Sequence, residues 1–587
     1  MTFLPLTAKE MQQLGWEQPD FVLITGDAYV DHPSFGAAII GRLLERYGYK
    51  VAILAQPDWK SVTDFRRFGK PRLGFLVTSG NVDSMVNHFS VSLHRRKSDK
   101  YAPGGVAGKR PDRAVIVYSN RAREAYKDVP VILGGLEASL RRMAHYDYWE
   151  DGLRRSILLD SKADLLIYGM GERAVLEVAE ALDGGIEAKD ISWIRGTCYP
   201  SKSLPEGVDI KRPPDYEALL QSKDEYCRSF AVQYRNNDSL TAVTLAEGYN
   251  QGQPSAIFVI QNPPQPPLER EELDDLYSLN FEGTWHPSYD EAGGVPALEE
   301  VEFSITANRG CFGSCSFCAL TYHQGRQVRS RSKASIVDEA SRLSAKPNFK
   351  GYIHDIGGPT ANFRNPSCKK QLTKGVCPNK ECLFPEPCRE LEVDHSEYLD
   401  VLTAVRQLPG IKKVFIRSGI RYDYLMADPD DRFFRELCQH HVSGTLKVAP
   451  EHVAPGTLKR MRKPGKKVYE AFQVKYKKIN QNINKNQYLI PYFISSHPGC
   501  TLDDAIDLAV YLKASGFVPD QVQDFYPTPG TLATCMYYTE KDPFTLEPIY
   551  VAKSAEDKKM QRALLHFNKK ENRALVEKAL KKAGRTL

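Results

Sequence analysis

Apolar segments of strand length alternate with helix-length segments through most of this 587-residue chain. Up to residue 225, several strand-length segments end in glycine turns, as at Gly26, Gly80 and Gly169, and the predicted strands are residues 20–25, 50–55, 73–80, 114–119, 130–135 and 164–169. Repetition of a strand, a turn and a helix is typical of a parallel sheet with helices on both faces. The sequence therefore predicts an α/β fold with a Rossmann-like N-terminal domain over residues 1–225, and places any ligand at the carboxyl ends of its strands.

The second half of the chain repeats the alternation, with predicted strands at residues 301–305, 350–358, 412–419, 444–450, 488–495 and 520–527. Six strands joined by helical crossovers predict a partial (β/α)6 barrel over residues 296–540, with functional residues on the loops that follow the strands. Between the two domains, the acidic and Pro-rich residues 226–295 predict an extended connector. After the barrel, residues 541–587 predict a basic helical tail.

The charge of the chain is concentrated in this tail. The whole chain has 79 Lys and Arg against 73 Asp and Glu, a net charge of +6, which by itself demands no nucleic-acid partner. Residues 551–587 carry 11 basic and 4 acidic residues, a net charge of +7. The tail is therefore either a solvated helical cap or a docking surface for RNA or another polyanion.

No apolar run approaches the roughly 20 residues of a membrane helix. The N-terminal residues show no signal-peptide pattern either. We therefore expect a cytoplasmic protein without membrane association.

Seven of the 12 cysteines lie between Cys311 and Cys388, and such crowding in a chain of this kind indicates metal ligands or redox groups rather than disulfides. Cys311, Cys315 and Cys318 directly follow the first predicted barrel strand with the spacing C-x3-C-x2-C. Three thiolates on one loop can converge on an iron–sulfur cluster, and three ligands for four irons leave one iron open to a substrate. The alternative is a structural zinc site that takes a further ligand from His323.

The C-x3-C-x-aromatic-C spacing resembles the signature of the radical SAM superfamily, and residues 26–59 and 299–332 resemble its YgiQ-type (UPF0313) branch. The resemblance extends over nearly the whole chain. It implies a [4Fe-4S] cluster on Cys311, Cys315 and Cys318, whose open iron binds S-adenosylmethionine (SAM). It further implies an external electron donor, flavodoxin-like or ferredoxin-like, and reductive cleavage of SAM to a 5′-deoxyadenosyl radical that abstracts hydrogen from a substrate.

The resemblance also suggests which residues contact SAM. In the superfamily, a Gly-Gly-Glu-like motif after the second strand holds the methionine amino group; Gly357 and Gly358 match it, whereas Pro359 replaces the acid. Further candidates for the methionine carboxylate and the ribose hydroxyls follow later strands: Ser418, Arg421, Lys447 and Glu451. For each of these, the alternative is an ordinary buried ion pair.

A second cysteine group lies in an insertion at residues 366–390, with the spacing C-x8-C-x4-C-x5-C over Cys368, Cys377, Cys382 and Cys388. Four thiolates suit a closed zinc site or a second iron–sulfur cluster, and unligated or redox-only thiols are a third interpretation. The insertion has no apolar periodicity, so we expect a metal to cross-link it.

The N-terminal domain resembles the cobalamin-binding domains attached to many radical SAM enzymes. Those that bind base-off cobalamin use the pattern Asp-x-His-x-x-Gly, but here Asp31 directly precedes His32 and Gly36 comes one place late. The sequence therefore disfavours cobalamin. Three functions remain as hypotheses: radical modification of RNA or a ribosomal component, radical chemistry in small-molecule or cofactor metabolism, and a non-catalytic iron–sulfur binding or sensing protein.

Overall fold

The computed structural model describes residues 3–519 and 522–585. The chain forms two compact units. The first unit ends at Glu302 and also includes Tyr322–Gln324, whereas the second comprises Phe303–Thr321 and the chain from Gly325 onward. A short piece of the sequence that follows Cys318 is therefore part of the first unit.

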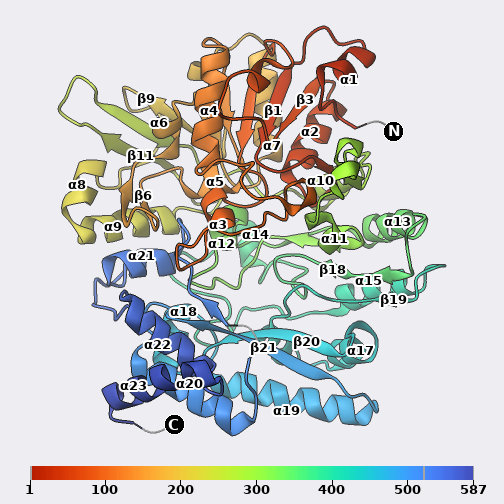
Figure 1. The fold of residues 1–587 in the computed structure, drawn as a ribbon, viewed down its shortest axis with the longest axis vertical. Coiled ribbons are helices and arrows are strands. Elements are labelled where there is room, and N and C mark those ends of the chain that lie inside the picture. The colour runs from red at the N-terminus through yellow and green to blue at the C-terminus, as the bar shows by residue number, and fades with distance from the viewer. Residues whose placement is uncertain (1–2, 520–521, 586–587) are drawn as a thin grey trace. The chain divides into compact units, whose positions relative to one another are not determined.

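A nine-stranded mixed sheet forms the centre of the first unit (Figure 1). Five strands run parallel in the order β3-β1-β4-β5-β8: β1 (Phe21–Thr25), β3 (Val51–Ala55), β4 (Gly74–Thr78), β5 (Val131–Leu133) and β8 (Leu165–Ile167). Four more extend the sheet beyond β8, three of them through antiparallel pairings: β9 (Thr197–Ser201), β12 (Ile257–Gln261), β11 (Thr244–Tyr249) and β10 (Ile210–Lys211). The predicted α/β architecture is confirmed.

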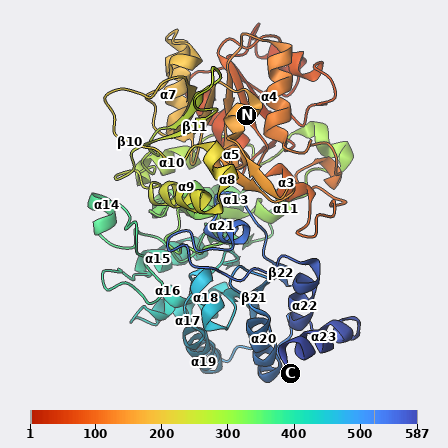
Figure 2. The same ribbon diagram turned by 90° about the vertical axis from the view of Figure 1, so that its left-hand side faces the viewer.

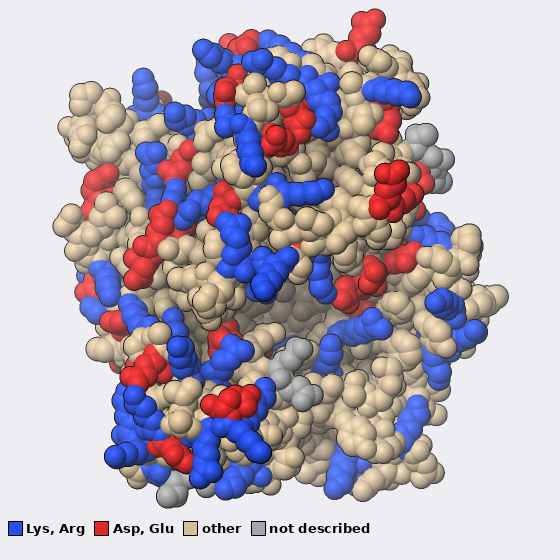
Figure 3. Space-filling view, viewed as in Figure 1, with Lys and Arg blue, Asp and Glu red and all other residues tan. Residues whose placement is uncertain are grey.

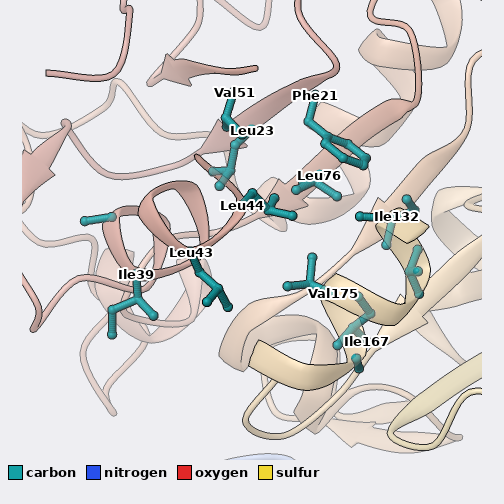
Figure 4. Close-up of a cluster of buried hydrophobic side chains, with 14 of the residues drawn as sticks. Phe21, Leu23, Ile39, Leu43, Leu44, Val51, Leu76, Ile132, Ile167 and Val175 are labelled. Atoms are coloured by element: carbon teal, nitrogen blue, oxygen red, sulfur yellow. The ribbon is translucent and has the colours of Figure 1, made fainter. Parts of the chain in front are cut away.

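Both faces of the parallel strands are buried, as their continuous apolar runs require. On one face, Leu23, Leu76 and Ile132 pack against α2 (Gly36–Arg46) and α7 (Glu172–Asp183) (Figure 4). The alternate residues of the same strands, such as Val22 and Val77, pack against α4 (Ala114–Ala125) and α6 (Ile157–Ser161). The period of two along each strand thus divides the core into two layers.

Residues 114–119, for which a strand is predicted, form the first half of helix α4 instead. The buried positions of α4 are Ala114, Val115, Tyr118, Ser119, Ala122 and Ala125, which lie on one face of a helix. The apolar run Ala-Val-Ile-Val continues into Arg and Ala residues that favour a helix, and packing on the sheet decides in its favour.

Residues 226–295 also differ from the predicted extended connector. They contain most of α9 (Lys223–Arg235), both strands of the β11–β12 hairpin and α10 (Arg270–Tyr277). The apolar run Ile-Phe-Val-Ile of β12 supplies Val259 and Ile260 to the two core layers of the sheet. The Pro-rich residues 262–269 form no helix or strand, because proline cannot donate to a ladder.

Short parallel strands form the second unit in chain order: β14 (Ser304–Thr306), β17 (Tyr352–Ile353) with β18 (Asp355–Gly357), β19 (Lys413–Val414), β20 (Thr445–Glu451), β21 (Tyr488–Ser495) and β22 (Gln523–Asp524). The ladders β14–β18, β17–β19, β20–β21 and β21–β22 are all parallel. This arrangement is the predicted partial (β/α)6 barrel. Of the predicted sixth strand, residues 520–521 lie outside the described residues.

Helices follow the strands of this unit: α13 (Lys333–Ser344), α15 (Ser396–Arg406), α19 (Lys466–Asn482) and α20 (Leu502–Ser515). The C-terminal helices α22 (Ala555–Leu565) and α23 (Arg573–Ala583) pack against α20, with Met560, Leu564 and Val576 meeting Ile506 and Ala509 (Figures 1 and 2). Across the described residues, every helix is too short or too polar to cross a bilayer.

Candidate functional site: the cysteine loop of the second unit

Cys311, Cys315 and Cys318 lie on one loop between β15 (Asn308–Arg309) and α12 (Leu320–Gln324). The loop begins at Gly310, whose φ is +80° and where a Cβ would lie 2.1 Å from the Gln327 carbonyl oxygen. Only glycine fits such a close approach to backbone in this conformation. The glycine therefore allows the chain to turn sharply before the first cysteine.

The three thiols are partly exposed and lie close to one another. Burial raises the pKa of the Cys318 thiol to about 12, and the nearby Cys315 and Cys311 thiols add to that rise. Burial also raises the pKa of Cys311, against a contact of 3.4 Å between its Sγ and Thr360 Oγ1. Thiols that raise one another's pKa lie close together, and a cationic metal group would reverse the effect.

Contacts on both sides of Ser316 hold the middle of the loop. Its backbone N–H donates to Met461 O of α18 (Pro455–Met461) at 3.1 Å, and its carbonyl accepts from Ala533 N of α21 (Leu532–Thr539) at 2.8 Å. The Ser316 hydroxyl lies 3.1 Å from His497 Nε2, and His497 Nδ1 lies 2.7 Å from Pro498 O. Because a carbonyl only accepts, Nδ1 carries the proton and Nε2 accepts from Ser316.

Arg421 lies beside the loop, immediately before α16 (Tyr422–Met426). Its Nη1 donates to Cys315 Sγ and to Gly313 O, each at 3.4 Å. Its other nitrogens bind Asp423, at 2.8 Å to Oδ1 and 2.5 Å to Oδ2. Burial acts to raise the pKa of Asp423, but the Arg421 guanidinium outweighs burial and lowers it. The Arg421 guanidinium is therefore held next to Cys315, a candidate cluster ligand.

A buried hydrogen-bonded chain positions the Arg421 backbone. Asn362 Oδ1 accepts from Arg421 N at 2.9 Å, and Asn362 Nδ2 donates to Arg421 O at 3.2 Å. Asn362 Nδ2 also lies 3.1 Å from His395 Nε2, and His395 Nδ1 lies 2.6 Å from Asp428 Oδ2. The amide donor and the carboxylate acceptor together fix the tautomer of His395.

Gly357 is the last residue of strand β18 and Gly358 follows it, and each allows a close approach. A Cβ at Gly357 would lie 2.3 Å from Ser418 Oγ, and one at Gly358 would lie 2.5 Å from Asn308 O. Asp355 of the same strand accepts from Arg417 N at 2.8 Å, from Ser418 N at 3.1 Å and from the Ser418 hydroxyl. Ser418 is therefore bound to a carboxylate two residues before Gly357.

Glu451 and Lys447, both on β20, have different surroundings. Glu451 is buried, has a φ of +66° and lies 3.7 Å from Lys463 Nζ. Burial raises the pKa of Glu451, against the lowering effect of Lys463 and Arg421. Lys447 is exposed. Of the six SAM-binding candidates, the structure brings Arg421 and Glu451 to the cysteine loop and leaves Lys447 at the surface.

Several residues of the site were missed from the sequence: Thr360, Asp355, Asn362, Asp423, Lys463 and His497. Asp355 and Asp423 carried a usable signal, since each is an acid at the end of a predicted barrel strand or two residues after Arg421. His497 and Asn362 carried none, because their role depends on contacts with residues far along the chain.

The second cysteine group lies around α14 (Lys370–Lys374), with all four thiols partly exposed. Cys377 Sγ lies 3.5 Å from Lys370 Nζ, and Cys382 Sγ lies 3.2 Å from Ser367 Oγ. Although burial opposes it, the pKa of Cys388 is lowered by the Glu390 backbone N–H and by Lys380. Lysine side chains thus accompany two of these thiols.

Neither cysteine group contains three or more His, Cys, Asp or Glu side chains already arranged around one metal-ion position, within residues 3–519 and 522–585. The donor chemistry of the first group nevertheless fits a [4Fe-4S] cluster, because it offers three neighbouring thiols and an N–H donor to one of them. A cluster is also larger than a single ion, so its ligands need not converge on one metal-ion position. The zinc alternative borrows His323, which belongs to the first unit.

Comparisons with known proteins agree with the sequence resemblance. A family model described as "Radical SAM N-terminal" matches residues 3–304, and a "Domain of unknown function (DUF3362)" matches residues 520–586. A UPF0313 protein of Clostridium perfringens (strain SM101) is 57% identical, over 99% of this chain and 88% of its own length. A UPF0313 protein of Clostridium botulinum (strain Kyoto) is 54% identical, over 100% of this chain and 90% of its own.

The chain is also similar to two solved enzymes. The radical SAM methyltransferase TsrM from Kitasatospora setae is 14% identical, with a TM-score of 0.48, over 88% of this chain and 76% of its own. The cobalamin-dependent radical SAM enzyme OxsB is 10% identical, with a TM-score of 0.46, over 97% of this chain and 62% of its own.

These structures contain cobalamin, in TsrM together with a [4Fe-4S] cluster, and they overturn the prediction that disfavoured cobalamin. That prediction depended on the displaced pattern around His32. His32 is buried, and its Nδ1 accepts from Ser34 N at 3.1 Å, so its ring is part of a local turn.

The radical SAM model covers more than half of the sequence, and the clostridial relatives match it from end to end. The chain therefore belongs to the UPF0313 family and is a radical SAM enzyme.

Proposed function

We propose that Cys311, Cys315 and Cys318 hold a [4Fe-4S] cluster with which this enzyme cleaves SAM reductively and starts hydrogen abstraction from its substrate. The observation that carries the proposal is the set of three neighbouring thiols on one anchored loop, with Arg421 donating to Cys315 Sγ at 3.4 Å. When bound, the cluster supplies an electron and an open iron, and SAM yields methionine and a 5′-deoxyadenosyl radical.

The side chains and backbone around the loop would bind and orient the cluster and SAM. Arg421 offsets the negative charge of a Cys315 thiolate, and Asp423 holds the guanidinium in place. The Gly358 carbonyl is a candidate acceptor for an ammonium group, whereas the Gly357 carbonyl already accepts from Ala307 N at 2.6 Å. Glu451 is a candidate acceptor for ribose hydroxyls. Lys447 has the weakest support, since it lies exposed on β20.

The test uses full-length protein reconstituted anaerobically with iron and sulfide. We expect about four irons in the first cluster, an electron paramagnetic resonance signal after reduction that changes on addition of SAM, and formation of 5′-deoxyadenosine. Cluster absorbance without any 5′-deoxyadenosine would contradict the proposal and favour a non-catalytic iron–sulfur binding or sensing protein.

RNA or a ribosomal component is the substrate class that we propose first, and the basic tail supports it only in part. Seven of its 11 cations already have partners in the protein: Lys553, Lys558, Arg562, Arg573, Lys578, Lys582 and Arg585. Acidic side chains lie among the basic ones over α22 and α23 (Figure 3). Among the described residues, no ion pair involves Lys559, Lys569, Lys570 or Lys581.

A small-molecule or cofactor substrate is the second candidate. A cavity of about 210 Å³ in the first unit, lined by residues that include Leu23, Leu76 and Ile132, supports it. Retention of labelled RNA at rising salt distinguishes the two candidates, because phosphate contacts give a steep salt dependence. We further propose a cytoplasmic location and an external flavodoxin-like or ferredoxin-like electron donor, which a reduction assay with purified donors can test.

We also propose a second metal site, zinc or an iron–sulfur cluster, on Cys368, Cys377, Cys382 and Cys388. Its support is the lysine side chains near two of these thiols, which stabilise thiolates, and the single short helix of the insertion. Metal analysis of protein with Cys377 and Cys388 changed to Ala tests it: loss of zinc, or of iron beyond the first cluster, is expected.

A further inference from the structure

A strongly basic loop in the first unit, residues 89–109, follows α3 (Ser84–His88) and leads toward α4. It contains five Lys and Arg residues against a single acid, a net charge of +4: Arg95, Arg96, Lys97, Lys100 and Lys109 against Asp99. Lys and Arg side chains gather around the position of α3 on the face drawn in Figure 3. Because the loop lies between β4 and α4, it belongs to the carboxyl edge of the parallel strands.

The acid of the basic loop does not offset the charge on its outer side. Asp99 is buried and pairs with the buried Arg110 at 3.1 Å. Its Oδ1 also accepts from Tyr101 N at 2.9 Å. The carboxylate is thus used inside the fold, and the charged side chains that the loop exposes are all basic.

Hydrogen bonds hold the backbone of the basic loop in two turns. Ser90 N donates to His94 O at 2.9 Å in the first turn, and Asp99 N donates to Gly105 O at 3.0 Å in the second. The cations therefore extend from a backbone that is already ordered. A ligand that binds them needs to order little more than the side chains, which lowers the entropic cost of binding.

Three of the five cations have no acidic partner among the residues that the structure describes: Arg96, Lys97 and Lys109, all of them exposed. Arg95 pairs with Asp112 at 2.7 Å, and Lys100 lies 3.4 Å from Glu300. In the C-terminal tail, by contrast, most cations are already paired within the protein. A larger share of the charge of the basic loop can therefore contact an external anion.

The other exposed side chains of the basic loop help to identify that anion. They are Ser92, Leu93, His94, Ser98 and Val106. The centre of a protein–protein interface is enriched in aromatic residues and depleted in Lys, but the aromatic residues of this loop, Phe89 and Tyr101, are only partly exposed. Arg, Lys and Ser side chains are typical contacts of nucleic-acid phosphates. The composition of the loop thus favours a nucleic acid over an acidic protein.

We propose that the basic loop is a docking surface for the phosphate backbone of RNA, with Arg96, Lys97 and Lys109 as its main contacts. The proposal rests on RNA as the proposed substrate class and names the part of the first unit that would hold it. Phosphate contacts position a strand without reading its sequence, so RNAs of unrelated sequence should bind with a similar and steep salt dependence.

The test compares RNA binding by the unchanged full-length protein, reconstituted with iron and sulfide, and by a variant that combines Arg96→Gln, Lys97→Gln and Lys109→Gln. Fluorescence anisotropy with a labelled single-stranded RNA of mixed sequence, between about 50 and 200 mM salt, gives the affinity and its salt dependence. We expect the triple variant to bind at least about tenfold more weakly at the lowest salt, and the slope of log K against log salt to be smaller by about 2, from about 0.7 for each lost contact. Lys109→Gln alone should reduce the slope by about 0.7.

The matched control combines Lys50→Gln, Lys127→Gln and Lys162→Gln. These three exposed lysines lie shortly before β3, β5 and β8, at the amino edge of the same strands. The control loses the same net charge, but at the opposite edge of the sheet from the basic loop. Because salt screens charges that are far from the RNA, its affinity should stay within about threefold of the unchanged protein. Circular dichroism checks that each variant is folded.

Equal weakening in the two triple variants would show that net charge alone matters, and it would overturn the proposal. Unchanged RNA binding in the variant of the basic loop would overturn it as well, and so would a loss of binding to an acidic flavodoxin in place of RNA. If the unchanged protein bound no RNA, both the docking surface and RNA as the substrate class would be wrong. Formation of 5′-deoxyadenosine in the absence of RNA should be the same in all variants, so a failure of the docking surface can be distinguished from a failure of the proposed radical chemistry.

Discussion

The two units treat charge in opposite ways at their candidate sites. In the first unit, the cavity at the carboxyl ends of the parallel strands is lined largely by aliphatic side chains and glycines, and among the described residues neither Lys nor Arg lines it. In the second unit, the cysteine loop is surrounded by buried charges, with Arg421, Asp423, Glu451 and Lys463 close to the thiols. The first environment is largely apolar, whereas the charges of the second lie in pairs, because buried charge is tolerated only where it is paired.

The most direct test of the proposed iron–sulfur site in the second unit is to remove one of its three candidate cysteine ligands. Changing Cys311, Cys315 or Cys318 singly to Ala is expected to abolish the cluster signal and 5′-deoxyadenosine formation, because three thiolates are the minimum set for this cluster. Iron analysis and electron paramagnetic resonance provide the measurement. Cys438→Ala is the control, since that thiol is buried in the core of the same unit; an unchanged signal in the Cys311 variant would refute the assignment.

Removing one member of the buried ion pair should have the next largest effect. Arg421→Ala leaves Asp423 as an uncompensated buried charge, and we expect the free energy of unfolding to fall by about 3–5 kcal/mol. Urea unfolding of the metal-free protein measures it. The double variant Arg421→Met with Asp423→Leu should recover a large part of that loss. If Arg421→Ala alone left stability unchanged, the charged character of this site would be in doubt.

Glu247, a buried acid of the first unit, has a pH dependence that contrasts with that ion pair. Burial raises the pKa of Glu247 to about 7 from 4.5, even though Tyr249 and Ala144 donate to it. Between pH 4.5 and 7 the folded protein binds more protons than the unfolded chain, so stability falls as the pH rises, by about 3 kcal/mol in all.

Glu247→Gln removes this titration. Relative to the unchanged protein, the variant should gain about 3 kcal/mol in unfolding free energy between pH 4 and pH 8. Denaturant unfolding at several pH values provides the measurement, and the exposed Glu180→Gln is the control. A pH profile identical to that of the unchanged protein would show that Glu247 does not titrate in this range.

Surface charge of the second unit should matter least for stability. Changing Lys559, Lys569, Lys570 and Lys581 together to Gln is expected to alter the free energy of unfolding by less than about 1 kcal/mol, since exposed charges contribute little. If the tail binds RNA, the same change should reduce the salt dependence of RNA binding by about 0.7 for each phosphate that the variant no longer neutralises. An unchanged dependence would remove the support of the tail for RNA.

Much of the molecule was predictable because its signals are local. The alternation of strand and helix segments predicted the α/β class, the parallel strands and the six strand positions of the barrel, since each of these depends on apolar periodicity within a few residues. The spacing of Cys311, Cys315 and Cys318 likewise lies within eight residues. Its family assignment was confirmed by relatives that match the whole chain.

Other features depend on partners that are distant in sequence. Residues 114–119 have a strand-like composition, yet they form the first half of helix α4. The buried side chains of this helix pack on one face of the sheet. Strand β12 becomes part of that sheet only by pairing with β9 and β11. Contacts between residues that are distant in sequence form only in the folded chain. They produce no periodic pattern in the sequence.

The same distinction applies to the sites. Local spacing identified the thiols, but the tertiary structure placed Arg421 against Cys315, His497 against Ser316 and Asp355 against Ser418. It also placed His323 in the cavity of the first unit rather than with the cysteines that precede it. Periodicity and spacing describe geometry over a few residues, whereas the burial and pairing of charges depend on the assembled core. The cysteine ligands could therefore be predicted from the sequence, but the residues that surround them could not.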